Sequence, residues 1–208
     1  MLLYAITGRH LLRGSESEQR EKLVALAHKW ARAGVDYIQL REKDLPDSEL
    51  LELAGRIVAV VRQESRETRI LVNGPAEIAL EAGADGVHLT GSARAGAEEV
   101  VRTLYRQTGR EPVVSRACHS VEEVRAARSA SLIVFAPVFE KVSRQDAEDG
   151  QQGVGLGVLF EACRAADPVP VIALGGLTSE NAAACISEGA AGVAGIRLFL
   201  HDDWQALR

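Results

Sequence analysis

A short motif that recurs along the chain constrains the fold more than any other feature. The clearest copy covers residues 82–92. Gly83 follows a helix-type segment there, residues 86–89 form a short apolar run, and residues 90–92 form a small polar loop. Glycine lacks a Cβ and can take the left-handed conformation that ends a helix, while such an apolar run is typical of a buried strand. The motif therefore predicts a helix stop, a strand and a polar loop at the strand's carboxyl end.

The same order of features returns at intervals. Residues 33–40 repeat it about 49 residues earlier, and residues 188–196 form a looser third copy. A degenerate fourth copy covers residues 126–137. A spacing near 50 residues is about twice one strand-plus-helix unit, so the visible copies correspond to every second strand. A solenoid also repeats at such a period, but long apolar strands and glycine-marked loops favour a closed α/β barrel.

Apolar periodicity and cap residues predict eight strands that alternate with about eight helices. The expected strands cover residues 2–7, 36–40, 69–73, 86–89, 112–115, 132–135, 169–174 and 192–196. The expected helices cover residues 16–33, 47–64, 75–81, 97–107, 121–128, 158–165 and 181–188, with a short last helix from residue 202. A long polar loop is expected at residues 140–153. This order predicts an α/β fold, a single (β/α)8 TIM barrel.

Length and composition limit the function classes. The chain has 208 residues, which suits one domain over residues 1–208 and is short for two. The formal net charge of −5 argues against nucleic acid or a membrane surface as partner. We expect neither a membrane span nor a signal peptide. The three cysteines are widely spaced in apolar settings, which favours packing over metal binding and a reduced, cytoplasmic location.

Chemistry in such a barrel lies on the loops at the carboxyl ends of the strands. Gln39, Arg41 and Lys43 alternate at the end of the second strand, so their side chains project to one side. An amide, a guanidinium and an ammonium suit a ligand with phosphate or carboxylate oxygens. A solvated turn over residues 41–44 is the alternative interpretation.

Glycines mark the ends of the last two strands. Gly175 and Gly176 follow the seventh strand, and Gly195 and Ile196 end the eighth, with Arg197 beside them. Backbone N–H groups of such loops can approach a phosphate closely. Paired glycines that only form a tight turn are the alternative.

A histidine follows the fifth strand. His119 lies just beyond Ser115 and next to Ser120, and its imidazole titrates near neutrality, so it can carry a proton. A structural histidine is the alternative. His88 lies within an apolar strand and is interpreted as packing.

These loops together resemble the thiamine phosphate synthase superfamily over essentially the whole chain. The matching motifs are residues 39–44, 82–89, 137–139 and 172–178. The resemblance implies an enzyme of thiamine biosynthesis. The synthase of this family joins a pyrimidine diphosphate to a thiazole phosphate, and two acidic positions hold its magnesium. This chain has Gly74 after Asn73 at the first position and no acid in residues 90–94 at the second. A hard dication prefers anionic oxygen ligands, so we expect no metal.

These departures resemble the TenI-type branch, which acts as a thiazole tautomerase with no metal and no second substrate. That branch similarly has Asn-Gly after the third strand and a His-Ser-x-Glu-Glu segment after the fifth, as at residues 119–123. The resemblance implies that His119 is the acid–base residue. The main hypothesis is therefore a tautomerase that needs no cofactor.

Two alternatives stay open: thiamine phosphate synthase, which would need magnesium, and a non-catalytic regulator that binds thiazole phosphate. The expected partner is a small-molecule thiazole phosphate, and a homo-oligomer stays open. The residues expected to bind the substrate are Gln39, Arg41, Lys43, Asn73, Ser115, Gly175, Gly176, Gly195 and Ile196.

Overall fold

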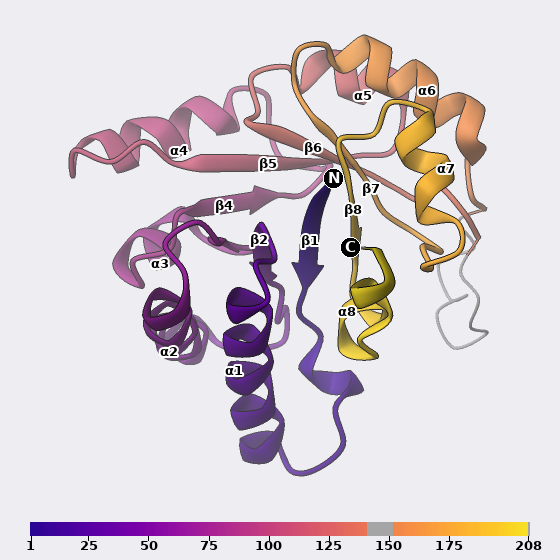
Figure 1. Cartoon of the computed structure of the whole chain (residues 1–208). Coiled ribbons are helices and arrows are strands. Elements are labelled where there is room, and N and C mark those ends of the chain that lie inside the picture. The colour runs from indigo at the N-terminus through magenta and orange to yellow at the C-terminus, as the bar shows by residue number, and fades with distance from the viewer. Residues whose placement is uncertain (141–151, 208) are drawn as a thin grey trace. The chain divides into compact units, whose positions relative to one another are not determined.

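A computed structural model describes residues 1–140 and 152–207 of the chain (Figure 1). The strands in these ranges are β1 (Leu2–Ile6), β2 (Tyr37–Leu40), β3 (Arg69–Val72), β4 (Gly86–Leu89), β5 (Val113–Cys118), β6 (Leu132–Phe135), β7 (Val171–Ala173) and β8 (Gly192–Gly195). The α-helices are α1 (Glu16–Arg32), α2 (Asp47–Glu64), α3 (Ala76–Glu81), α4 (Ala97–Arg106), α5 (Val121–Ala126), α6 (Gly155–Ala166), α7 (Ala182–Ser187) and α8 (Arg197–Leu200). Short 3₁₀ helices cover η1 (Arg9–Leu11) and η3 (Asp203–Leu207).

The strands are joined in a closed parallel barrel in the order β1 to β8. The eight-stranded α/β barrel expected from the sequence is therefore confirmed. Most of the polar loop expected at residues 140–153 lies outside the described residues. No helix in the described ranges is both long and apolar enough to cross a bilayer.

Three parts of the expected pattern differ from the structure. Helix α6 begins at Gly155 and not at residue 158. The fifth strand was expected to end at Ser115, but β5 continues to Cys118, paired residue by residue with β6. Ser115 is buried inside the strand, and Arg116 donates from its guanidinium to the Ala93 carbonyl at 2.6 Å. Ser115 and Arg116 are polar, so the local pattern predicted the end of the strand there. The burial of the Ser115 hydroxyl and the hydrogen bond of Arg116 depend on distant parts of the chain and cannot be seen in a local pattern.

The end of the chain also differs from the expectation. Residues 197–200 form the short helix α8, which was not predicted, and the helix expected from residue 202 is the 3₁₀ helix η3. Phe199 stacks on Trp204 with ring centroids 5.7 Å apart, and both rings are buried. This aromatic contact fixes two turns that are too short to show helical periodicity.

Backbone contacts divide the chain into two compact units. The N-terminal unit comprises residues 4–89 and 96–114, and the C-terminal unit comprises residues 1–3, 90–95 and 115–208. Each unit is described by itself below. The expectation of a single domain over residues 1–208 stays a prediction.

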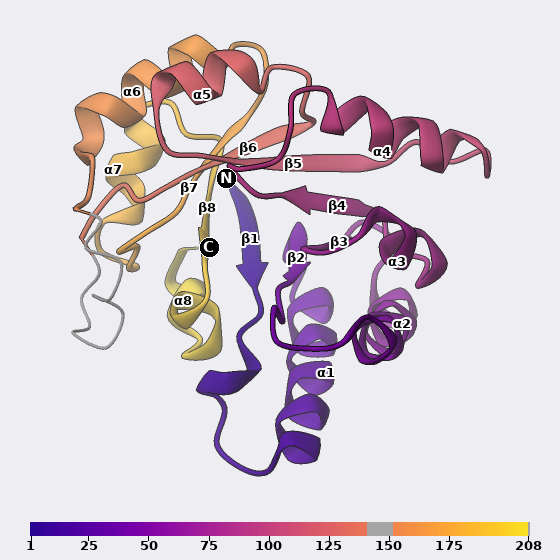
Figure 2. The same ribbon diagram turned by 180° about the vertical axis from the view of Figure 1, so that it is seen from behind.

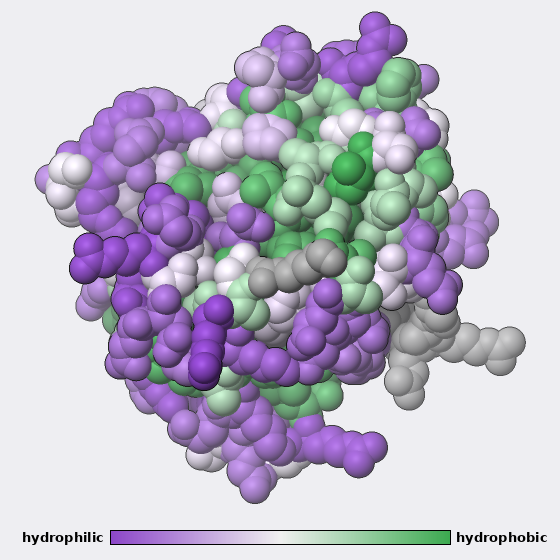
Figure 3. Space-filling model, viewed as in Figure 1, coloured by the Kyte–Doolittle hydropathy of each residue, from purple (hydrophilic) through white to green (hydrophobic). Residues whose placement is uncertain are grey.

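Helix α1 shows how the N-terminal unit is built from its sequence. Ser15 caps the helix, since its hydroxyl accepts from the Glu18 N–H and the Glu18 carboxylate accepts from the Ser15 N–H. Leu23, Ala27 and Trp30 recur at helical spacing and are buried. Helix α1 packs beside α2 (Figure 1), and the surface over α1 is mostly hydrophilic (Figure 3). Each large side chain buried on this inner face stabilises the fold by about 1.5–3 kcal/mol.

The C-terminal unit has its own apolar core. Helix α5 lies beside α6, as both ribbon views show (Figures 1 and 2). Phe135 of β6, Leu159 of α6 and Cys185 of α7 are buried together. The core thus links the strand β6 to the helices that follow it.

Gly86 provides a test of how tightly the barrel strands pack. A Cβ at Gly86 would lie 1.8 Å from the backbone oxygen of Val113, whereas a Cβ at Gly55, inside α2, would meet no atom within 4 Å. We predict that Gly86→Ala lowers the free energy of unfolding by about 3 kcal/mol or more. Gly55→Ala should raise it by about 0.5–1 kcal/mol, because alanine favours the helix. Urea denaturation of both variants measures the two effects, and equal stabilities would contradict the packing argument.

Candidate active site

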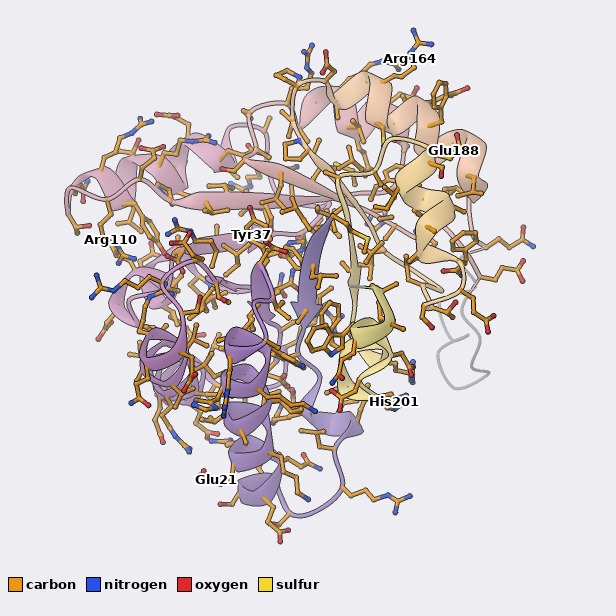
Figure 4. All side chains as sticks on the ribbon, in the orientation of Figure 1. Glu21, Tyr37, Arg110, Arg164, Glu188 and His201 are labelled. Carbon is orange, nitrogen blue, oxygen red and sulfur yellow. The ribbon has the colours of Figure 1, made fainter. Side chains whose placement is uncertain are left out.

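In the N-terminal unit, Gln39 is held by a tyrosine of the neighbouring strand. Gln39 is buried in β2, and its amide nitrogen donates to the Tyr4 hydroxyl at 3.0 Å. The Tyr4 ring stacks on Tyr37, which Figure 4 labels on β2, with ring centroids 5.6 Å apart. This bond uses the amide nitrogen, so the amide oxygen is the group that Gln39 can offer to a donor on a ligand.

His88 contacts the hydroxyl of the same tyrosine. Its Nδ1 is 3.5 Å from the Tyr4 hydroxyl oxygen. Burial, together with the nearby positive charges of Arg41 and Lys43, lowers the pKa of His88 to about 3. His88 is therefore a neutral imidazole at pH 7. Asn73 donates from its amide to the His88 carbonyl at 3.3 Å, so these residues of β1, β2 and β4 and the loop after β3 form one polar cluster.

Arg41 and Lys43 bring positive charge to this cluster. Arg41 is half-buried and Lys43 is exposed. Within the described part of the chain, neither side chain makes a hydrogen bond or an ion pair. Two cations beside a neutral imidazole can bind phosphate or carboxylate oxygens. The turn over residues 41–44 is not wholly solvated, because Glu42 is buried and bonds to Arg9 at 2.9 Å, while Lys43 and Asp44 are exposed.

In the C-terminal unit, His119 follows β5 directly and is exposed. Its Nδ1 is 2.7 Å from the backbone oxygen of Ala136. A carbonyl oxygen only accepts hydrogen bonds, so in the neutral ring Nδ1 carries the proton and Nε2 holds a lone pair. The His119 N–H donates to Glu123 at 2.7 Å, and Ser120 caps the helix that carries Glu123. Hydrogen bonds therefore hold both the main chain and the imidazole ring of His119 in place.

The loop after β4 approaches this imidazole closely at a glycine. A Cβ at Gly91 would lie 3.2 Å from Nε2 of His119 and 3.1 Å from its Cδ2. The hydroxyl oxygens of Thr90 and Ser92 are 3.0 Å apart and share a hydrogen bond. Gly91 thus borders the ring edge of His119 that includes Nε2.

Close packing explains why residues 175 and 176 are glycines. Gly175 and Gly176 have φ angles of 101° and 62°. A Cβ at Gly175 would lie 2.7 Å from Cα of Pro137, and one at Gly176 would lie 2.4 Å from the Glu140 oxygen. The loop after β7 therefore needs glycine to approach the loop after β6 closely. The alternative of a tight turn explains both glycines, and phosphate binding by them stays a prediction.

The remaining expected binding residues are placed as follows. Gly195 ends β8 and is buried, and Ile196 precedes α8, whose first residue is Arg197. Ser115, expected as the last residue of its strand, lies inside β5. The structure brings Gln39, Arg41, Lys43 and Asn73 together in the N-terminal unit.

Sequence reasoning missed three contributors. Tyr4 orients Gln39, Gly91 borders His119, and Arg9 binds the acid between the two cations. Only Arg9 had a visible signal, which is an arginine directly after an apolar strand and a glycine.

Comparisons with known proteins assign this chain to a family. Residues 3–199 match the family described as Thiamine monophosphate synthase. A thiamine-phosphate synthase of Methanoculleus marisnigri is 34% identical, and the match covers 92% of this chain and 84% of that protein. One of Anaeromyxobacter dehalogenans is 36% identical, with 85% and 75% covered. The solved thiamine phosphate pyrophosphorylase from Pyrococcus furiosus has the same fold, with a TM-score of 0.78 at 23% identity over 100% of this chain and 93% of that chain.

His88 predicts an acid-dependent loss of stability. Its pKa is about 3 when folded and about 6.5 when unfolded, so between these values the unfolded chain binds a proton that the folded protein does not. Stability should fall as the pH drops from 6.5 toward 3, by up to about 1.4 kcal/mol per pH unit from this residue. His88→Gln should show a shallower fall between pH 6.5 and 5 in urea denaturation. Equal slopes for the two proteins would contradict the neutral, buried imidazole.

Proposed function

Because the chain belongs to the thiamine monophosphate synthase family, we propose that it is an enzyme of thiamine biosynthesis that acts on a thiazole phosphate. The family match over residues 3–199 and the names of the relatives support the pathway. The cations Arg41 and Lys43, which have no partner among the described residues, suit the anionic groups of such a substrate. We further propose a cytoplasmic location and no nucleic-acid or membrane partner.

The geometry supports a thiazole tautomerase best. The observation that carries this proposal is the 2.7 Å contact between Nδ1 of His119 and the Ala136 oxygen. It keeps the proton on Nδ1 and leaves Nε2 as the base. In a tautomerisation one proton leaves one atom of the substrate and returns at another, so a single base that becomes an acid suffices.

The steps at His119 balance without any other reactant. Nε2 accepts the proton from the thiazole carboxylate phosphate, and the imidazole becomes an imidazolium. The Nδ1–H bond to the Ala136 carbonyl stabilises that cation, and the main-chain bond to Glu123 holds the residue in place. The imidazolium then returns the proton at the new position, which restores the neutral ring and yields the aromatic thiazole.

Thiamine phosphate synthase is the second candidate, and the comparisons favour it over the tautomerase. The relatives described above are named for this reaction. Magnesium, which the synthase reaction implies, does not fit the residues present. The Asn73 amide donates to a carbonyl, the hydroxyls of Thr90 and Ser92 bond to each other, and neither place offers a carboxylate. Among the described residues there is also no cluster of three or more metal-binding side chains.

A pair of assays distinguishes the candidates. In the first, the purified protein receives the thiazole carboxylate phosphate alone, and its conversion to the aromatic form is followed by absorbance. In the second, it receives both phosphates with magnesium, and thiamine phosphate is measured. Turnover in the first assay supports the tautomerase, and turnover in the second supports the synthase. Tight thiazole phosphate binding without either activity would identify a regulator.

His119→Gln tests the assigned base. We expect the turnover number of the tautomerase to fall by about 10²–10⁴-fold, because glutamine cannot accept the proton. The dissociation constant for thiazole phosphate should change by no more than about twofold, since glutamine keeps a polar side chain of similar size. His201→Gln is the matched control, because His201 is exposed just beyond α8 (Figure 4), and it should leave both values unchanged. Unchanged turnover in His119→Gln would remove this residue from the mechanism.

A further inference from the structure

The acidic residues of the segment 41–44 are bound by an arginine from a distant part of the chain. Nη1 of Arg9 donates to Glu42 at 2.9 Å and to Asp44 at 2.8 Å, and Nη2 donates to Asp44 at 2.7 Å. The contact with Asp44 is bidentate, the strongest geometry for this pair of groups. All three residues belong to the N-terminal unit. The two acids thus point to Arg9, not to their own neighbours Arg41 and Lys43.

Arg9 uses four of the five N–H groups of its guanidinium on carboxylates. Its Nε donates to Glu16 at 2.7 Å, so every nitrogen of the guanidinium bonds to a carboxylate. The Arg9 side chain is only 5% exposed, and that of Glu42 is 1% exposed. Removing one partner of such a buried pair leaves a charge without compensation. Because its guanidinium is buried and each of its nitrogens holds a carboxylate, Arg9 acts through the residues that it holds.

A second set of hydrogen bonds ties the backbone of the cationic segment to Glu42. The Thr7 hydroxyl donates to Glu42 at 2.6 Å and accepts from the Arg41 N–H at 2.8 Å. The Arg9 N–H also donates to Glu42, at 3.2 Å. The ends of β1 and β2 are thus locked together around one buried carboxylate.

The consequence concerns charge. Residues 41–44 carry two positive and two negative side chains, and in water such neighbours screen one another. The hydrogen bond with Arg9 lowers the pKa of Asp44 to about 2, which agrees with a strong pairing of these two groups. Arg41 and Lys43 are then the cations of this segment that have no partner among the described residues.

We propose that Arg9 is a positioning residue that creates an anion site at Arg41 and Lys43 by drawing Glu42 and Asp44 away from them. The ligand is a phosphate group, as on the thiazole phosphate, so this assignment rests on the proposed function. Arg9 itself does not touch the ligand.

The test measures inorganic phosphate binding by titration calorimetry in folded variants. Arg9→Gln should weaken binding by about tenfold or more, because the released acids turn to the two cations. Adding Asp44→Asn to this variant should restore part of the affinity, and adding Glu42→Gln as well should bring it within about threefold of the wild type. Thermal melting, recorded in parallel, should stay below the wild type in all three variants. If the phosphate affinities of the variants followed their melting temperatures, and not the number of acids released from Arg9, the proposal would be overturned.

Two further variants keep the test decisive. If Arg9→Gln does not fold, Arg9→Lys keeps one charge but cannot bind Asp44 through two nitrogens, so it should weaken phosphate binding several-fold, and Asp44→Asn should rescue it. Arg20→Gln is the matched control, because Arg20 bonds to Glu16 and Glu49 in the same network but not to Glu42 or Asp44. Its phosphate affinity should equal that of the wild type, and a loss as large as in Arg9→Gln would contradict a specific role for Arg9.

The ligand and the site have their own controls. Arg41→Gln should abolish phosphate binding, and binding that survives would overturn the site. Acetate in place of phosphate should bind far more weakly, and equal binding would overturn the phosphate assignment. Phosphate binding that depends on Arg9, in a protein without either thiamine activity, would support this inference while refuting the proposed function.

Discussion

The backbone ladder between neighbouring strands is the constraint on which the other features depend. It is tightest at the first residues of β4 and β8, where a Cβ on Gly86 would lie 1.8 Å from the Val113 oxygen and one on Gly192 would lie 2.2 Å from the Leu2 oxygen. Both glycines occupy the same place in the repeated motif, the first residue of an apolar strand, where the copy at residues 33–40 has Tyr37. In these two copies the glycine therefore marks a close approach of neighbouring strands, and the strand ends determine where the polar side chains lie.

The elements and the residues at the strand ends could be predicted because their signals are local. A capped helix such as α1 and an apolar run such as β4 each show within a few residues. Contacts between distant residues could not be predicted in this way. Ser115 was expected to end its strand because only the ladder with β6 shows that the strand continues to Cys118. The partnership of Arg9 with Glu42 joins residues 33 positions apart, and no local pattern reports it.

The family assignment and the reaction rest on different kinds of evidence. The family is shown by the match over residues 3–199, and the names of the relatives agree better with the synthase, which the sequence analysis placed second, than with the tautomerase. The geometry of His119 and the absence of carboxylates at Asn73 and in residues 90–92 favour the tautomerase. One barrel supports several reactions through its loops, so the side chains decide the chemistry.

The pairing of Arg9 with Glu42 and Asp44 has a consequence for protein engineering. The segment 39–44 looks like a self-contained cassette that could be moved to another barrel to install a phosphate site. Moved without Arg9, the segment would bind phosphate poorly. Glu42 and Asp44 would have no arginine to hold them and would turn to the two cations. The transplantable unit is therefore discontinuous and includes position 9 and the hydroxyl of Thr7. In a set of natural relatives, the residue types at positions 9, 42 and 44 should accordingly change together.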